Sequence, residues 1–195
     1  MEDTLEELGI GPSCRQEWNG RIADVERLVT CTHHVHYKEN FEPDLSAYQW
    51  LRKQLVDSGD PSFTASDRVY ISRNDAATRR VRNESKLMEA LEDRGFERHI
   101  LSKLTFSEQI QLFQQAETIV GPHGAGLVNI LFGDSLSVVE LFPETMIEPY
   151  YYLLATILGH DYRYGCYPTI GGATDINVDV DDVIHLVDEI TERSF

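Results

Sequence analysis

The sequence predicts an α/β fold, a Rossmann-like parallel sheet with helices on both of its faces. From residue 68 onwards, short apolar runs alternate with amphipathic segments, which is the order of strands and helices in such a sheet. One apolar run, 118–120, ends in Gly-Pro-His-Gly-Ala-Gly and is followed by a helical pattern at 127–132. A strand, a glycine-rich turn, a helix and a further strand form the layout of a nucleotide-binding βαβ unit.

The elements ahead of this unit divide the chain in two. Residues 25–32 have the pattern of a strand, and 44–58 carry apolar residues at helical spacing. The polar segment 59–67 contains glycine and proline and is interpreted as a linker. We therefore predict a short first part, residues 1–60, and a main domain, residues 61–195.

The elements of the main domain follow from apolar periodicity and from end signals such as Gly95, which suits a helix C-terminus. Ser107 is interpreted as the capping residue of the second helix. The predicted strands are 68–72, 98–101, 118–120, a run ending at residue 140, and 161–164; the predicted helices are 84–94, 105–115, 127–132, 149–158 and 181–192.

Composition limits the function classes. The net charge of −16 argues against a nucleic-acid partner, since a phosphate backbone needs a basic surface, whereas a nucleotide needs only a few local cations. Such acidity is typical of halophilic proteins, and an ordinary acidic surface is the alternative. We expect the acids of the last segment to lie on solvated faces: Asp175, Asp179, Asp181, Asp182, Asp188, Glu189 and Glu192.

Neither a membrane span nor a metal site is predicted. No window approaches the roughly 20 apolar residues of a transmembrane helix, and the acidic start lacks the pattern of a signal peptide, so we expect a cytoplasmic protein. The three cysteines contain no Cys-x-x-Cys pair. Cys31, His33, His34 and His36 stand close together, but their spacing fits no standard zinc set.

The glycine-rich turn is the first candidate site. Gly121, Gly124 and Gly126 let the backbone turn and approach a ligand without a Cβ in the way. The helix that follows directs its N-terminal N–H groups at the turn, which favours an anion. His123 lies inside the turn, and Glu140 ends the next strand at the sheet edge where open α/β sheets bind ligands. The alternative is a packing turn with an exposed histidine and a solvated glutamate.

Four arginines form the second candidate site. Arg73, Arg79, Arg80 and Arg82 follow the strand 68–72 at its carboxyl end. The planar guanidinium group binds phosphate oxygens in pairs, and a loop at this edge of a sheet is where such contacts are made. In so acidic a chain, pairing with surface acids is the alternative. Their clustering at a strand end favours phosphate.

These segments together resemble the C-terminal part of glycosyltransferase family 61. The resemblance covers residues 69–141 in order and spacing, and its pieces are VYISR, RRVRNE, the Gly95-Phe96 turn, SEQIQLFQQA, VGPHGAGLVNILF and VVEL. It implies the C-terminal half of a GT-B fold and an inverting, metal-independent transfer from a nucleotide sugar, usually a UDP-sugar, to a glycan or polysaccharide acceptor. It implies no cofactor.

The resemblance also assigns site residues, which we state as its implications. Arg73 and either Arg79 or Arg80 would neutralise the diphosphate, and Glu140 would bind the ribose. His123 is the one catalytic candidate, and it is equally suited to bind phosphate or backbone. The other matching positions are Asn83, Glu84, Gln109, Gly124, Ala125 and Gly126; for Asn83 and Glu84, starting a helix is the alternative.

The sequence departs from the family in its first part, because only about sixty residues precede Arg68. They resemble at most the last strand and the linking helix of an acceptor-binding domain. We therefore expect either an acceptor-binding partner chain or a truncated, non-catalytic nucleotide-binding module, including a vestigial transferase fragment. Asp179-Val180-Asp181 matches the Asp-x-Asp metal motif of other transferases, but a helix start explains it better.

Overall fold

A computed structural model of the chain describes residues 2–15, 45–171 and 174–191. The chain forms two compact units, Met1–Leu55 and Val56–Phe195. The first unit contains the helices α1 (Glu2–Glu7), η1 (Pro12–Cys14) and α2 (Leu45–Leu55). The strand predicted at 25–32 and the cluster of Cys31 with three histidines lie outside the described residues.

The second unit is built on a five-stranded sheet with the order β2-β1-β3-β4-β5, in which every neighbouring pair is parallel. From β1 the chain moves outward to β2 and then returns to the other side of β1 as β3. The gap between β1 and β3 is therefore the topological switch point of the sheet. The strands are β1 (Arg68–Ile71), β2 (Glu97–His99), β3 (Thr118–Pro122), β4 (Ser137–Pro143) and β5 (Asp161–Tyr167).

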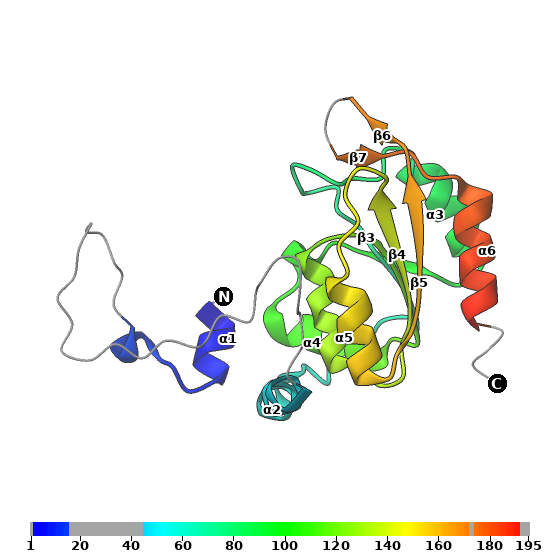
Figure 1. Cartoon of the computed structure of the whole chain (residues 1–195). Coiled ribbons are helices and arrows are strands. Elements are labelled where there is room, and N and C mark those ends of the chain that lie inside the picture. The colour runs from blue at the N-terminus through cyan, green and yellow to red at the C-terminus, as the bar shows by residue number, and fades with distance from the viewer. Residues whose placement is uncertain (1, 16–44, 172–173, 192–195) are drawn as a thin grey trace, which may run out of the picture. The chain divides into compact units, whose positions relative to one another are not determined.

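Helices cover both faces of this sheet, as Figure 1 shows. The helices α3 (Glu84–Glu92) and α6 (Val180–Thr191) cover one face. The other face carries α4 (Phe106–Gln115), η4 (Ala125–Phe132) and α5 (Tyr150–Leu158). This arrangement confirms the predicted α/β Rossmann-like fold.

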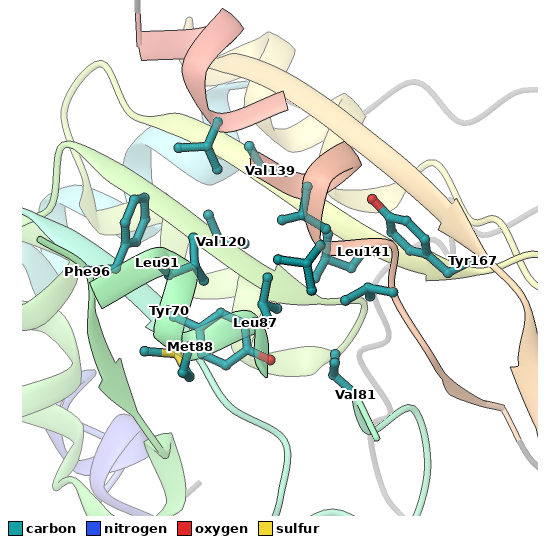
Figure 2. Packing of buried hydrophobic residues seen from close by; sticks show 14 of the residues in the cluster. Tyr70, Val81, Leu87, Met88, Leu91, Phe96, Val120, Val139, Leu141 and Tyr167 are labelled. Atoms are coloured by element: carbon teal, nitrogen blue, oxygen red, sulfur yellow. The ribbon is translucent and has the colours of Figure 1, made fainter. Parts of the chain in front are cut away.

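A hydrophobic core lies between the sheet and the pair α3 and α6 (Figure 2). The strands contribute Tyr70, Val120, Val139 and Leu141, all fully buried. Because side chains alternate along a strand, Glu140 between Val139 and Leu141 points to the opposite face, towards the layer of η4 and α5. The position of the core therefore determines the face of β4 on which Glu140 lies.

One local prediction is wrong. The capping residue of α4 is Thr105, not Ser107: Thr105 Oγ1 accepts from the N–H of Glu108, and the Glu108 carboxylate accepts from the N–H of Thr105. The reciprocal capping box places the capping residue two positions earlier than predicted. The helix predicted after the glycine turn is present and has the 3₁₀ form, η4. Its three-residue repeat aligns Leu127 with Ile130, and both are buried.

Three further elements complete the unit. A short 3₁₀ helix, η2 (Val56–Ser58), begins it, and another, η3 (Leu101–Lys103), follows β2. A small antiparallel pair that was not predicted, β6 (Thr169–Ile170) with β7 (Asp175–Ile176), lies outside the main sheet. A parallel bridge between Val81 and Ile176 joins this pair to the arginine-rich loop. Among the described helices, none has the length and apolar character needed to cross a membrane.

Candidate functional site

A cavity of about 170 Å³ lies at the carboxyl ends of β1 and β3. Its lining includes Arg73 and Asp75 from the loop after β1, and Gly124 and Leu127 from the segment after β3. The cavity therefore opens at the switch point of the sheet, which is where doubly wound α/β folds bind ligands. The two stretches that the sequence singled out meet here.

Arg73 occupies the space that Gly124 leaves free. A Cβ added at Gly124 would lie 2.0 Å from Arg73 Nη1, so any larger residue would displace the guanidinium. The φ of Gly124 is 172°, an extended value open to every residue, so the close approach is what requires glycine here. The space beside this glycine was predicted for a ligand, and in the structure the Arg73 guanidinium lies there.

The Arg73 guanidinium has little to neutralise it. Arg73 Nη2 donates to the Thr78 carbonyl at 3.3 Å, and the buried Nε has no hydrogen-bond partner. Burial lowers the pKa of Arg73, and the like charge of Arg79 lowers it further, with the Asp75 carboxylate opposing this effect. A desolvated cation beside a second cation is an arrangement that an anion stabilises.

Arg79 contributes the second charge from a strained backbone. Its φ of 60° lies in the left-handed region, which non-glycine residues seldom adopt. Within the part of the chain that the structure describes, neither Arg73 nor Arg79 forms an ion pair.

Arg80 and Arg82 have a different surrounding. Both guanidinium groups contact Asp175 Oδ2 at 2.9 Å, and the N–H of Arg80 donates to Asp175 Oδ1. Burial acts to raise the pKa of Asp175, but the hydrogen bonds and charge of Arg80, with the charge of Arg82, hold this pKa below its usual value. Asp175 is 0 % exposed, so the expectation of a solvated carboxylate is wrong for this residue.

His123 and Glu140 form a buried pair. His123 Nδ1 lies 2.5 Å from Glu140 Oε1, and the Tyr162 hydroxyl donates to Glu140 Oε2 at 2.5 Å. The exposed fractions are 5 % for His123 and 0 % for Glu140. The alternative of an exposed histidine and a solvated glutamate is therefore wrong. Both carboxylate oxygens are already hydrogen-bonded inside the protein, and the ribose contact of Glu140 stays a prediction.

Tyr162 and Tyr151 are two site residues that sequence reasoning missed. The Tyr151 ring lies 5.4 Å from the His123 ring, which also stacks on Phe142 at 5.0 Å. Burial raises the pKa of Tyr151 to about 12, with the charge of Glu140 adding to the rise and Arg79 and Arg73 opposing it. Tyr151 is thus electrostatically coupled to both candidate clusters. The tyrosine-rich start of the segment 149–158 was the available signal.

The other predicted residues make contacts within the fold. The Glu84 carboxylate accepts from Ser72, Asn74 and Arg98. The Asn83 side chain bonds the backbone of Val178 in both directions, at 2.8 and 3.0 Å.

On the face of the sheet that α4 covers, the Gln109 amide donates to the carbonyls of Leu101 and Leu104 and accepts from Asn129. Ala125 is exposed in the first turn of η4. A Cβ at Gly126 would lie 2.6 Å from Leu101 Cδ1, so this glycine is needed for packing. For these residues a donor-binding role stays a prediction.

The Asp-x-Asp stretch forms a helix start. Asp179 Oδ1 accepts from the N–H groups of Asp181 and Asp182 at the beginning of α6, which confirms the preferred interpretation. Over the described ranges, no three histidine, cysteine, aspartate or glutamate side chains gather in a way that could hold a metal ion.

The fold and the site define a doubly wound α/β domain with a cationic cavity at its switch point. A comparison with protein families identifies it further: the model of the family Glycosyltransferase 61 matches residues 1–139. The chain belongs to this family and is by family a glycosyltransferase. The match includes the whole first unit and ends one residue before Glu140. A search of curated proteins finds no match.

Proposed function

We propose that this chain binds the nucleotide-sugar donor, a UDP-sugar, of a glycosyltransferase that extends a glycan or polysaccharide acceptor. The observation that carries the proposal is Arg73, which lines the cavity at the switch point, together with Arg79, whose charge lowers the pKa of Arg73. The partly desolvated Arg73 guanidinium, with the charge of Arg79 near it and neither group in an ion pair among the described residues, matches the two charges of a diphosphate. The family membership supplies the sugar transfer.

The two arginines would act on the leaving group. When the bond between the anomeric carbon and the diphosphate breaks, negative charge develops on the departing oxygen, and fixed cations stabilise that charge. In the inverting, metal-free reaction that we propose, Arg73 and Arg79 take the part that a divalent metal has in other transferases. The first turn of η4, which directly follows Gly124, adds backbone N–H groups to the same place.

His123 is the candidate for the proton transfer that an inverting reaction needs. The acceptor hydroxyl attacks the anomeric carbon, a base receives the hydroxyl proton, and the nucleoside diphosphate leaves. With Nδ1 of His123 bonded to the Glu140 carboxylate, Nε2 is the nitrogen left to accept that proton or to contact a phosphate oxygen. Glu140 then positions the ring, in addition to the ribose contact predicted for it.

Calorimetric titration tests the donor site. We expect the purified chain to bind UDP saturably, more tightly than other nucleoside diphosphates, at low or at high potassium chloride. Arg73→Ala should weaken binding by roughly 10- to 100-fold, because a charge-assisted hydrogen bond contributes about 1.5–3 kcal/mol. Arg82→Ala is the matched control, since Arg82 pairs with Asp175. A folded chain that binds no UDP would contradict the proposal.

Catalysis is tested separately from binding. The chain is mixed with a UDP-sugar and a glycan acceptor, and the released UDP is measured. Release that depends on the acceptor supports the transferase, whereas saturable UDP binding without turnover supports the non-catalytic nucleotide-binding module. Supplying a candidate acceptor-binding chain distinguishes an incomplete enzyme from an inactive one.

A further inference from the structure

A second cavity, of about 520 Å³, lies beside β4 and β5 at the start of α5. Its volume falls in the range of small-molecule binding sites, roughly 300–1,000 Å³. The lining is rich in aromatic and apolar side chains: Phe142, Ile147, Tyr152, Tyr162 and Tyr164. We refer to these five residues as the tyrosine groove.

The rings of the tyrosine groove contact one another and remain accessible. The centroids of Tyr152 and Tyr162 are 5.6 Å apart, and those of Tyr162 and Tyr164 are 6.5 Å apart. Tyr152 is nevertheless 51 % exposed and Tyr164 54 % exposed. Large aromatic side chains held against each other at a surface, without being covered, are typical of a binding site.

The ring angles restrict the shape of the ligand. The interplanar angles are 64° for Tyr152 with Tyr162, 84° for Phe142 with Tyr164 and 33° for Tyr162 with Tyr164, so none of these pairs forms a parallel slot. A flat base is held best between parallel faces. A sugar ring needs one aromatic face for its C–H groups and polar groups around its edge, and the inclined rings provide the aromatic face.

The polar groups of the cavity favour an uncharged ligand. Glu148 and Arg163 belong to the same lining, so one acid and one base are present. Their opposite charges balance, so the lining has no net charge that would favour binding of an anion or of a cation. Carboxylate and guanidinium groups do hydrogen-bond well to neutral hydroxyl groups.

We propose that the tyrosine groove binds a neutral sugar ring of the acceptor glycan, stacked on Tyr152 or Tyr164 with its hydroxyls at Glu148 and Arg163. Naming the sugar as part of the acceptor rests on the proposed function. The groove touches that site through Tyr162, whose hydroxyl donates to Glu140, the partner of His123. The acceptor site would then lie partly on this domain, in addition to any partner chain.

Saturation-transfer NMR tests the groove directly on the full chain. The probes are neutral sugars: glucose, galactose, xylose, N-acetylglucosamine and the disaccharides maltose, cellobiose and lactose. We expect saturable transfer from the protein to the C–H groups of at least one of them. Tyr152→Ala or Tyr164→Ala should weaken that binding by roughly tenfold, as lost ring contacts predict, while the Phe variants retain it. Ile170→Ala, an exposed apolar residue outside the groove, is the control.

The outcomes separate this proposal from the donor site. Sugar binding that survives Arg73→Ala but not the two tyrosine variants supports the groove even if UDP does not bind. Transfer to none of the sugars from a folded chain overturns it, as does sugar binding that neither tyrosine variant weakens. Displacement of the sugar by uridine, with loss of uridine binding in the tyrosine variants, also overturns it, because the groove would then hold a nucleoside.

Discussion

Two pairs of arginines in one short loop have opposite surroundings. Arg80 and Arg82 contact the buried carboxylate of Asp175, whereas Arg73, which lines the cavity, and Arg79 form no ion pair with any residue that the structure describes. The four residues lie within ten positions of the sequence and have the same chemistry. The difference teaches that Asp175, 95 positions from Arg80 in the sequence, decides which of the arginines form ion pairs within the fold. The proposed donor site uses the other two.

Asp175→Asn should give the largest effect. An unchanged free energy of unfolding would contradict the difference between the two pairs of arginines. We expect the free energy of unfolding to fall by about 2–3 kcal/mol, because the charge-assisted hydrogen bonds of a buried carboxylate are lost. Denaturant unfolding measures this change. Asp188→Asn is the control: its pair with Arg94 is solvent-accessible and should contribute less than about 1 kcal/mol. Equal losses in the two variants would contradict the structural role of Asp175.

Arg73→Ala and Arg80→Ala should produce opposite patterns. For Arg73→Ala we expect the loss in UDP affinity given above, with the free energy of unfolding changed by no more than about 0.5 kcal/mol, because Arg73 has no ion-pair partner to lose. Arg80→Ala should lower the free energy of unfolding by about 1–2 kcal/mol and leave UDP affinity within about twofold. Titration calorimetry and denaturant unfolding of each variant measure both quantities. A loss of UDP affinity in Arg80→Ala would place Arg80 in the donor site.

Gly124→Ala should have a smaller effect of the same kind as Arg73→Ala. The new methyl group would lie 2.0 Å from Arg73 Nη1, and the flexible side chain can move away without harm to the fold. We therefore expect UDP affinity to fall by several-fold, about 1 kcal/mol, with little change in unfolding. Gly11→Ala is the control, since nothing lies within 4 Å of its Cβ position. Unchanged UDP affinity would show that the position of Arg73 is unimportant for binding.

The smallest expected effect is on the response to acid. The pKa of Asp175 is lowered in the folded protein, so its contribution is present above the pKa of the unfolded chain and is lost as the pH falls through the lower, folded value. Unfolding free energy measured from neutral pH downwards should therefore fall less steeply in Asp175→Asn than in the parent chain. A steeper acid response in the variant would contradict this sign.

Much of the architecture could be predicted because it depends on local patterns. The strands β1 and β3 and the helix α4 were placed within two residues of their observed bounds, since apolar periodicity and turn residues specify them. The family resemblance was likewise carried by contiguous motifs. The 3₁₀ form of η4 was missed because apolar periodicity does not distinguish an α-helix from a tighter winding.

The sequence by itself determined the sheet, its two covered faces, the glycine turn and the family. Tertiary structure alone decided that Glu140 is hydrogen-bonded to His123 and Tyr162, that Asp175 is buried with two arginines, and that the Tyr151 ring lies beside the His123 ring. The physical reason is the range of the interactions. Helix and strand propensity act over a few residues, whereas burial and charge pairing depend on which distant segments the parallel crossovers bring together.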